Sequence, residues 1–429
     1  MKKKIHITLL GWILIAILLG LALGQVMPEG GVRAFMTFNA IFSQFLSFMI
    51  PLIIVGLVTP AIAGIGSSAG KMLLVTVLIG YADTVLAALL AYGTGSWLFP
   101  SMVASAPVGS VEEIRNVEPY FTISIPPMFD VMAALVFSFL VGLGVAYGKG
   151  QALMNVFDEF KEVIVKAIRV AIIPLLPPYI FGIFLNMSFT GQAFGIMAVF
   201  AQVIVVIVVL HVLILVYLFL IAGGMTSKNP FKLLWNMIPA YLTALGTSSS
   251  AATIPVTFER TLRNGVREEV AGFTVPLCAT IHMPGSAMKI TACALAICLM
   301  TGLPHDFPLF LGFILLLAIM MVASPGVPGG AIMAALAPLS SVLGFDAQAQ
   351  ALMIALYIAM DSFGTACNVT GDGAISLIVD RLFRNSSLPP ASAGSASASA
   401  PASAGSPSSS GSASASCSAP ASAAESDNL

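Results

Sequence analysis

The feature that most limits the fold is a series of long apolar segments that follow one another along the chain. Six of them lie at about residues 8–27, 35–65, 71–99, 128–148, 160–190 and 194–223. Each reaches the roughly 20 residues that a helix needs to cross a lipid bilayer. Hydrophobic residues make up 58% of the 429 residues and charged residues only 9%, so water is not the main solvent. The sequence therefore predicts an all-α polytopic membrane protein.

Charged residues between these segments predict how the chain lies in the membrane. An acidic loop, "GSVEEIRNVEPYF", separates connections that carry basic residues. The basic residues are Lys149, Lys228, Lys232, Arg260, Arg263, Arg267, Arg381 and Arg384. Because cytoplasmic loops carry an excess of Lys and Arg, this alternation predicts a multi-pass membrane protein with both termini in the cytoplasm. The lysines at positions 2–4 leave a signal peptide open as an alternative for the first segment.

Two later segments are interrupted in a way that predicts re-entrant hairpins. Residues 229–265 form two apolar limbs that meet at "TSSS", and residues 307–343 are interrupted at "SPGVPGG". Each hairpin precedes a long segment with its own break or polar stripe, "PLCATIHMPGSAMKITACALAICLM" or "IAMDSFGTACNVTGDGAI". Lipid cannot form hydrogen bonds with the free N–H and C=O groups of irregular backbone. The hairpin tips and helix breaks are therefore expected to meet at a central site within the protein. A hairpin followed by an interrupted helix, twice, predicts an inverted repeat.

The last of these segments carries a stripe of polar side chains. On a helix that turns about 100° per residue, Asp361, Thr365, Asn368 and Asp372 return to nearly the same azimuth. A carboxylate inside a bilayer is costly and normally marks an ion or substrate path. The alternative is a stripe that only holds helices together. The stripe therefore predicts a binding site on this helix.

Four motifs carry a resemblance to a known family. "GTSSSAATIP", "PLCATIHMPGSA", "ASPGVPGGAIM" and "DSFGTACNVTGD" occur in this order and resemble the signature regions of the dicarboxylate/amino acid:cation symporter family, which includes the glutamate transporters. The resemblance covers about residues 5–384. It implies about eight transmembrane helices plus the two hairpins. It also implies a homotrimer in the plasma membrane that imports a small molecule together with ions by an elevator-type mechanism.

The same resemblance implies a division into a scaffold domain and a transport domain. The scaffold would hold helices 1 and 2 within residues 1–70, helix 4 within 71–148 and helix 5 within 149–190. The transport domain would hold helix 3, also within 71–148, and the core at 194–384. Residues 385–429 are rich in Ala, Ser, Gly and Pro, which predicts a disordered cytoplasmic tail.

Roles for individual residues also follow from the resemblance. Asp361, supported by Thr365, is expected to hold the substrate ammonium, and Asn368 the substrate carboxylate. The other substrate-binding positions are Ser249, Ser250, Ser286, Val327, Gly329 and Gly364. The expected sodium site consists of Asp372, Asn368 and, partly through backbone carbonyls, Cys278 and His282.

One departure from the family pattern concerns the substrate. Gly364 stands where members that carry acidic substrates have an arginine, and a glycine cannot pair with a side-chain carboxylate. We therefore expect a neutral amino acid. Glutamate, aspartate or a dicarboxylate is the alternative, if Lys289, His282 or another basic residue supplies the missing charge.

A second departure concerns the ions. Pro284 in "HMPGS" replaces a family aspartate that helps to bind a further sodium. Asp83, about 18 Å into its helix, and Lys289 are charges at unusual depth, and we expect them to pair and to shift coupling towards fewer sodium ions or towards protons. The alternative is that both reach water-filled crevices and have no role in coupling. Na⁺ and H⁺ are the expected coupling ions, and no other cofactor is expected.

Other classes of protein fit the sequence less well. An intramembrane aspartyl protease needs two carboxylates that share one proton, whereas Asp361 and Asp372 lie about 16 Å apart along a helix. A serine nucleophile in "TSSS" has only His282 as a plausible base, and hairpin tips suit occlusion better than an ion channel. The five cysteines, including Cys417 as a free thiol in the tail, show no metal-ligand spacing. No enzyme activity and no nucleic-acid partner are expected.

Overall fold

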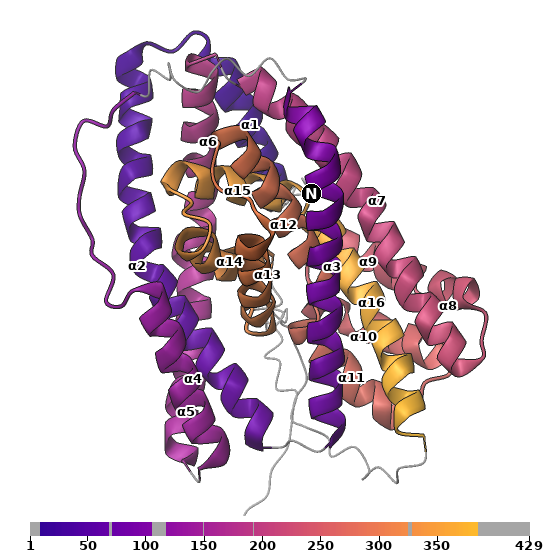
Figure 1. Cartoon of the computed structure of the whole chain (residues 1–429). Coiled ribbons are helices and arrows are strands. Elements are labelled where there is room, and N and C mark those ends of the chain that lie inside the picture. The colour runs from indigo at the N-terminus through magenta and orange to yellow at the C-terminus, as the bar shows by residue number, and fades with distance from the viewer. Residues whose placement is uncertain are drawn as a thin grey trace, which may run out of the picture. The chain divides into compact units, whose positions relative to one another are not determined.

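The structure, a computed structural model, describes residues 9–67, 71–104, 117–148, 150–191, 193–324 and 328–384, and these ranges contain helices but no strand. The helices are α1 (Leu9–Gly24), α2 (Glu29–Ser67), α3 (Lys71–Ala104), α4 (Val131–Tyr147), α5 (Gln151–Ala167), the π-helical η2 (Ile168–Ile172), α6 (Ile173–Phe189), α7 (Ala193–Thr226), α8 (Pro230–Asn236), α9 (Ile238–Thr247), α10 (Ser250–Arg263), α11 (Glu268–Ile281), α12 (Pro284–Thr301), α13 (Phe307–Val322), α14 (Gly330–Ser341), α15 (Ala347–Ala359) and α16 (Asp361–Leu382) (Figure 1). The all-α polytopic membrane fold predicted from the sequence is confirmed. The predicted tail lies outside the described residues.

Five helical stretches are long and apolar enough to cross a membrane by length and composition. They are Glu29–Pro60, Lys71–Val103, Gln151–Phe189, Met197–Thr226 and Glu268–Thr301. A sixth is counted if α15 and α16, which meet at an angle of 62°, form one bent span. The described parts of α1 and α4 are shorter than the predicted segments. The number of about eight spans therefore stays a prediction.

Each predicted hairpin contains helical limbs on both sides of its expected tip. The first consists of α8 and α9, a turn at Ser248 and Ser249, and α10. The second consists of α13 and α14. Residues 325–327, which lie between these helices in the sequence, are outside the described residues. The limbs α9 and α10, with 10 and 14 residues, are too short to cross a bilayer alone. That the two units enter the membrane and turn back remains a prediction.

The described helices pack in two groups. In one group, α2 packs against α4, α5 and α6, and α1 packs along α6. In the other, α16 packs against α7, α9, α10, α11 and α12, and α3 lies along α12 (Figure 1). The second group contains all the polar groups of the predicted site except those of the second hairpin, which contacts both groups. The division into a scaffold domain and a transport domain stays a prediction.

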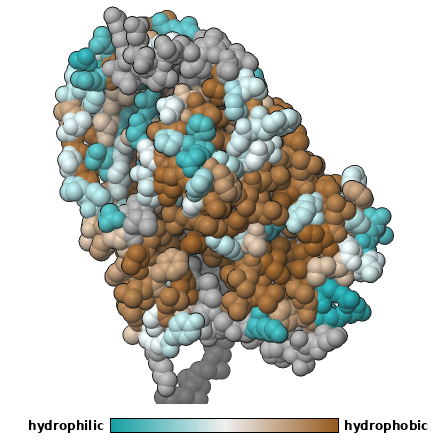
Figure 2. Space-filling model, viewed as in Figure 1, coloured by the Kyte–Doolittle hydropathy of each residue, from teal (hydrophilic) through white to brown (hydrophobic). Residues whose placement is uncertain are grey.

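Apolar side chains also cover much of the outer surface. The exposed positions of α7 recur at helical spacing, at Val205, Val209, Val212 and Leu213, and those of α3 include Leu86 and Leu90. Figure 2 shows this as a wide hydrophobic area on the face in view. A helix that is apolar on its exposed side as well as its buried side is typical of a lipid environment. The surface of the described residues is therefore suited to a bilayer.

Candidate functional site

The break between α11 and α12 is caused by Pro284. Proline has no N–H group and disfavours the helical conformation in the residue before it, so the chain leaves the helix at His282 and Met283 and re-enters it at Pro284. His282 has φ −108° and ψ 101°, which is extended backbone. The break thereby turns the His282 side chain between α3 and α16.

The turn of the first hairpin is set by two serines. Ser248 adopts the left-handed conformation, with φ 50° and ψ 28°, and ends α9. Ser249 then caps α10, because its side-chain oxygen accepts a hydrogen bond from Ala252 N. The Ser248 hydroxyl lies 2.7 Å from the hydroxyl of Ser362 on α16. Ser250 is buried behind the turn. The tip of this hairpin is therefore joined directly to the start of α16.

The second hairpin brings a backbone donor to the same helix. Gly329 has φ 73°, a conformation that a glycine adopts without strain, and it caps the N-terminus of α14. Its N–H donates a hydrogen bond of 2.9 Å to Asp361 Oδ2. The positive end of the α14 dipole therefore faces the Asp361 carboxylate.

Asp361 forms a buried ion pair with Lys289. Lys289 Nζ lies 3.1 Å from Asp361 Oδ1, and the two side chains are 0% and 8% exposed. The ammonium also lies 3.5 Å from the centroid of the Tyr357 ring, within the range of a cation–π contact. Both oxygens of Asp361 therefore have partners within the protein, one on α12 and one at Gly329.

The expected ion pair between Asp83 and Lys289 is wrong. Lys289 pairs with Asp361, and Asp83 pairs with His282. The physical reason is the direction in which the lysine side chain extends. Helix α12 packs between α3 and α16, and Lys289 extends past Gly364 towards the start of α16. A Cβ on Gly364 would lie only 2.8 Å from Lys289 Nζ and 2.9 Å from its Cε. Lys289 thus occupies the space that a side chain at position 364 would fill.

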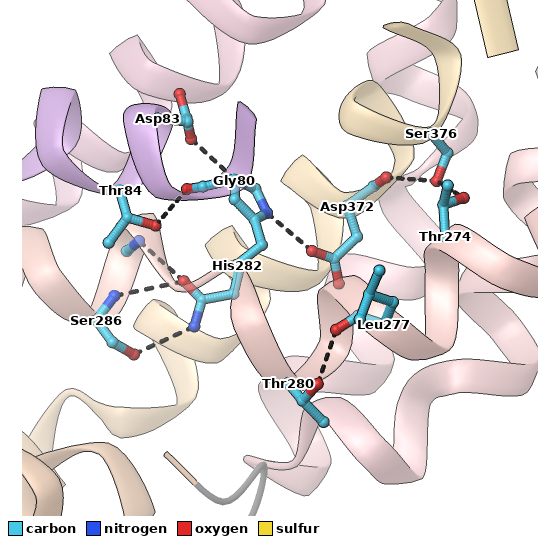
Figure 3. A network of polar contacts seen from close by, with 12 residues as sticks. Gly80, Asp83, Thr84, Thr274, Leu277, Thr280, His282, Ser286, Asp372 and Ser376 are labelled. Atoms are coloured by element: carbon cyan, nitrogen blue, oxygen red, sulfur yellow. Dashed lines mark hydrogen bonds and ion pairs between the residues drawn. The ribbon is translucent and has the colours of Figure 1, made fainter. Parts of the chain in front are cut away.

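A second buried cluster joins Asp83, His282 and Asp372. His282 Nε2 lies 2.9 Å from Asp83 Oδ2, and His282 Nδ1 lies 2.9 Å from Asp372 Oδ1. Figure 3 shows the two carboxylates on opposite sides of the ring, one from α3 and one from α16. In each of these two contacts one hydrogen atom lies between the nitrogen and the oxygen. The three side chains therefore share two hydrogen atoms. The cluster therefore carries a single net negative charge, whether the second hydrogen belongs to the imidazole or to a carboxyl group.

Asn368 ties the break in α11–α12 to α16. Its Oδ1 accepts hydrogen bonds from the backbone of Gly285, at 2.8 Å, and of Ser286, at 3.4 Å. Its Nδ2 donates to Ser286 Oγ at 3.1 Å, and that hydroxyl lies 3.2 Å from the Tyr357 hydroxyl. The amide side chain therefore satisfies the first N–H groups of α12, which have no partner within that helix.

We expect Asn368→Ala to lower the free energy of unfolding by about 1–2 kcal/mol, because it leaves the buried N–H of Gly285 without an acceptor. Thermal unfolding of the purified protein in detergent measures the change. Asn155→Ala is the matched control, since its side chain bonds only to Gln151 on the exposed side of α5. Equal unfolding temperatures for the two variants would contradict this role of Asn368.

The structure brings most of the predicted residues together and leaves some outside the network. Thr365 donates to the backbone carbonyl of Asp361 and not to its carboxylate. The carbonyl of Cys278 accepts the N–H of His282 at the end of α11. Val327 lies outside the described residues. Ser249 caps α10 at the hairpin tip.

Several polar residues of this region were missed in the sequence. They are Ser248, Tyr357, Ser362 and His211, whose Nε2 lies 3.0 Å from the carbonyl of Gly285. His211 had a usable signal, because an ionisable residue within a long apolar helix points to function. The contacts of the His282 imidazole with Asp83 and Asp372 were also missed, since only the carbonyl of His282 was considered for the sodium site.

The sequence profile of the sodium:dicarboxylate symporter family matches residues 9–382. The chain belongs to this family. Among curated relatives, excitatory amino acid transporter 1 of Rattus norvegicus is 30% identical over 265 residues, which are 60% of this chain and 48% of the relative. Serine/threonine transporter SstT of Acinetobacter baumannii (strain AYE) is 28% identical over 411 residues, 89% of this chain and 98% of the relative.

The comparisons confirm the predicted family resemblance. The chain spans about half the length of the excitatory amino acid transporters that it matches, and nearly the whole length of the serine/threonine transporter. The family and these relatives are transporters and not enzymes. This confirms the prediction that the protein is not an enzyme such as an intramembrane protease. The geometry agrees, since Asp361 and Asp372 have separate partners and do not share a proton with each other.

Proposed function

We propose that the chain is a secondary active symporter that imports a neutral, zwitterionic amino acid, and that the Lys289–Asp361 ion pair binds the amino acid. The observation that carries this proposal is the pair itself, which is buried and joined to the tip of the second hairpin through Gly329. Buried charges in membrane proteins normally mark a substrate or ion path. Sodium or protons would drive uptake, as in the family to which the chain belongs.

Charge complementarity favours a zwitterion at this pair. An α-ammonium group can take the place of Lys289 at Asp361, while the α-carboxylate takes the place of Asp361 at Lys289. Each buried charge then exchanges one partner of opposite sign for another, and none is left alone, which would be costly. The ion pair has no net charge and neither has a zwitterionic amino acid, so no further charged residue is needed to balance the bound substrate.

An acidic amino acid or dicarboxylate is the second candidate, and one observation favours it. Lys289 lies against Gly364, the position at which acidic-substrate members carry an arginine. The charge of Lys289 is already balanced by Asp361, however, so a second carboxylate on the substrate would enter without a counter-charge. This balance is why we favour the neutral substrate.

The mechanism that we propose is of the elevator type, in a trimer in the plasma membrane. In it, α3 and α7–α16 would move as the transport domain against α1, α2 and α4–α6. The packing of α16 with α7, α9, α10, α11 and α12 supports this grouping, because it places both members of the ion pair, Lys289 on α12 and Asp361 on α16, in one group of helices. The turn at Ser248, joined to Ser362, and the cap at Gly329 would close the two sides of the site.

Competition for uptake into proteoliposomes tests the substrate. We expect unlabelled alanine and serine to inhibit uptake of a labelled neutral amino acid, and succinate and glutamate at equal concentration to inhibit it little. Sodium and proton gradients are imposed separately, so that the driving ion is measured in the same vesicles. Uptake of labelled succinate or glutamate that alanine and serine fail to inhibit would overturn the proposal.

A further inference from the structure

The imidazole of His282 contacts Asp372, a carboxylate that the family resemblance leads us to expect in a sodium site. Its two nitrogens each lie 2.9 Å from a carboxylate oxygen, of Asp83 on one side and of Asp372 on the other, and the imidazole is wholly buried. A hard cation would need these same oxygens as ligands. We propose that His282 is a built-in substitute for the cation and excludes sodium from the Asp372 site.

The surroundings of the ring fit an imidazole. Gly80 on α3 and Gly371 on α16 face it from two helices, and a Cβ added to Gly371 would lie 2.9 Å from His282 Cε1. A Cβ on Gly80 would lie 3.6 Å from His282 Cβ. The ring therefore occupies the space between the two helices, and an ion between Asp83 and Asp372 would have to displace it.

The other expected sodium ligands are engaged by donors of the protein. The carbonyl of Cys278 accepts the N–H of His282, and Asn368 Oδ1 accepts the N–H of Gly285. Among the described residues, no group of three or more His, Cys, Asp or Glu is arranged to hold a metal ion. The carbonyl oxygen of Cys278 and Oδ1 of Asn368 therefore each already accept a hydrogen bond from the protein.

Asp83 has a single partner for its carboxylate in this cluster. Its Oδ1 is buried and has no hydrogen-bond partner in the described part of the chain, while its Oδ2 bonds to His282. Two carboxylates therefore share one imidazole, and one of their oxygens remains unsatisfied. Removal of the ring should leave two buried carboxylates with a strong need for a cation.

This inference rests on the proposed function, because it assigns the ion specificity of the same carrier. Its test measures ion binding without transport, so it can fail while the proposed amino acid uptake holds, and the reverse. The assay follows thermal unfolding of the full chain in detergent while NaCl replaces choline chloride at constant ionic strength. A ligand that binds only the folded protein raises the unfolding temperature in a saturable way.

We expect the wild type and Asp372→Asn to respond alike to sodium, because Asp372 does not bind it in either protein. His282→Ala should gain a saturable response to sodium that the wild type lacks. Imidazolium chloride should stabilise this variant as well, by refilling the space. The response should vanish in His282→Ala/Asp372→Asn, and the control His305→Ala, at an exposed histidine, should behave as the wild type.

Two results would overturn the proposal. One is a sodium response in the wild type that Asp372→Asn removes, and the other is a folded His282→Ala protein that responds to neither sodium nor imidazolium. If His282→Ala does not fold, His282→Gln takes its place, because glutamine is polar and uncharged. The comparison of the wild type with Asp372→Asn needs no change at His282 and decides the question in any case.

Discussion

Lys289→Met is expected to abolish uptake and to lower the free energy of unfolding by about 3–5 kcal/mol, the usual cost of breaking a buried ion pair by removing one partner. Methionine fills much the same space as the lysine stem, so packing against Gly364 and Tyr357 is largely kept. What is lost is the ammonium that balances Asp361. The carboxylate would then stay buried with the N–H of Gly329 as a donor but without the positive charge that balances it.

A double variant separates the charge from the packing. Lys289→Met/Asp361→Asn removes both charges, so its unfolding temperature should recover most of the loss, while uptake should remain absent because the binding charges are gone. Lys232→Met, at an exposed lysine of α8, is the matched control. Chemical and thermal unfolding in detergent measure stability, and proteoliposomes measure uptake. If Lys289→Met is as stable as the control, the ion pair does not have the role given to it here.

Gly285→Ala is the second change with a large expected effect, a loss of about 3 kcal/mol of unfolding free energy from overpacking. A Cβ at this position would lie 2.7 Å from the carbonyl oxygen of Gly364 and 2.7 Å from Cys367 Cβ. One of these atoms belongs to the backbone of α16 and cannot swing aside. The helices α12 and α16 would have to separate, and the ion pair and the Asn368 hydrogen bonds lie across that contact.

Gly312→Ala is the matched control, since a Cβ there has nothing within 4 Å. Removing a glycine from a helix usually gains about 0.5–1 kcal/mol, so this control should be at least as stable as the wild type. Gly285→Ala should unfold at a lower temperature and show a weaker apparent affinity for the substrate in uptake assays. A Gly285→Ala protein with unchanged stability would show that α12 and α16 can part at no cost.

The arrangement of the site along the chain was predictable, because it depends on local rules. The polar stripe that begins at Asp361 does lie on one helix, and the breaks at Pro284 and at the hairpin tips occur where Pro, Gly and Ser interrupt apolar sequence. Proline and glycine act on their own backbone, so their effect can be read from the order of residues. The motifs around these breaks also carried the family resemblance.

The partners of the buried charges were not predictable in the same way. Which carboxylate a lysine meets depends on how far its side chain reaches between packed helices, and this depends on the residues opposite. Lys289 crosses Gly364 to reach Asp361, and His282 is turned towards Asp83 by the Pro284 break. The sequence contained the five ionisable groups of the two clusters but no signal that showed which of them pair. Helix lengths were also less certain, since an apolar segment can extend beyond the helix that it forms.

The contact between Gly364 and Lys289 limits the order in which this site can change during evolution. An arginine at position 364 would place its side chain in the space that the lysine fills, since even a Cβ there would lie 2.8 Å from the ammonium. The two positive side chains would also repel each other in a buried setting. The lysine must therefore be lost before the arginine can be gained, and the intermediate would carry an unbalanced Asp361. A carrier with the Lys289–Asp361 pair and a carrier with an arginine at position 364 therefore differ by at least two substitutions, and the protein that carries only the first of them is destabilised.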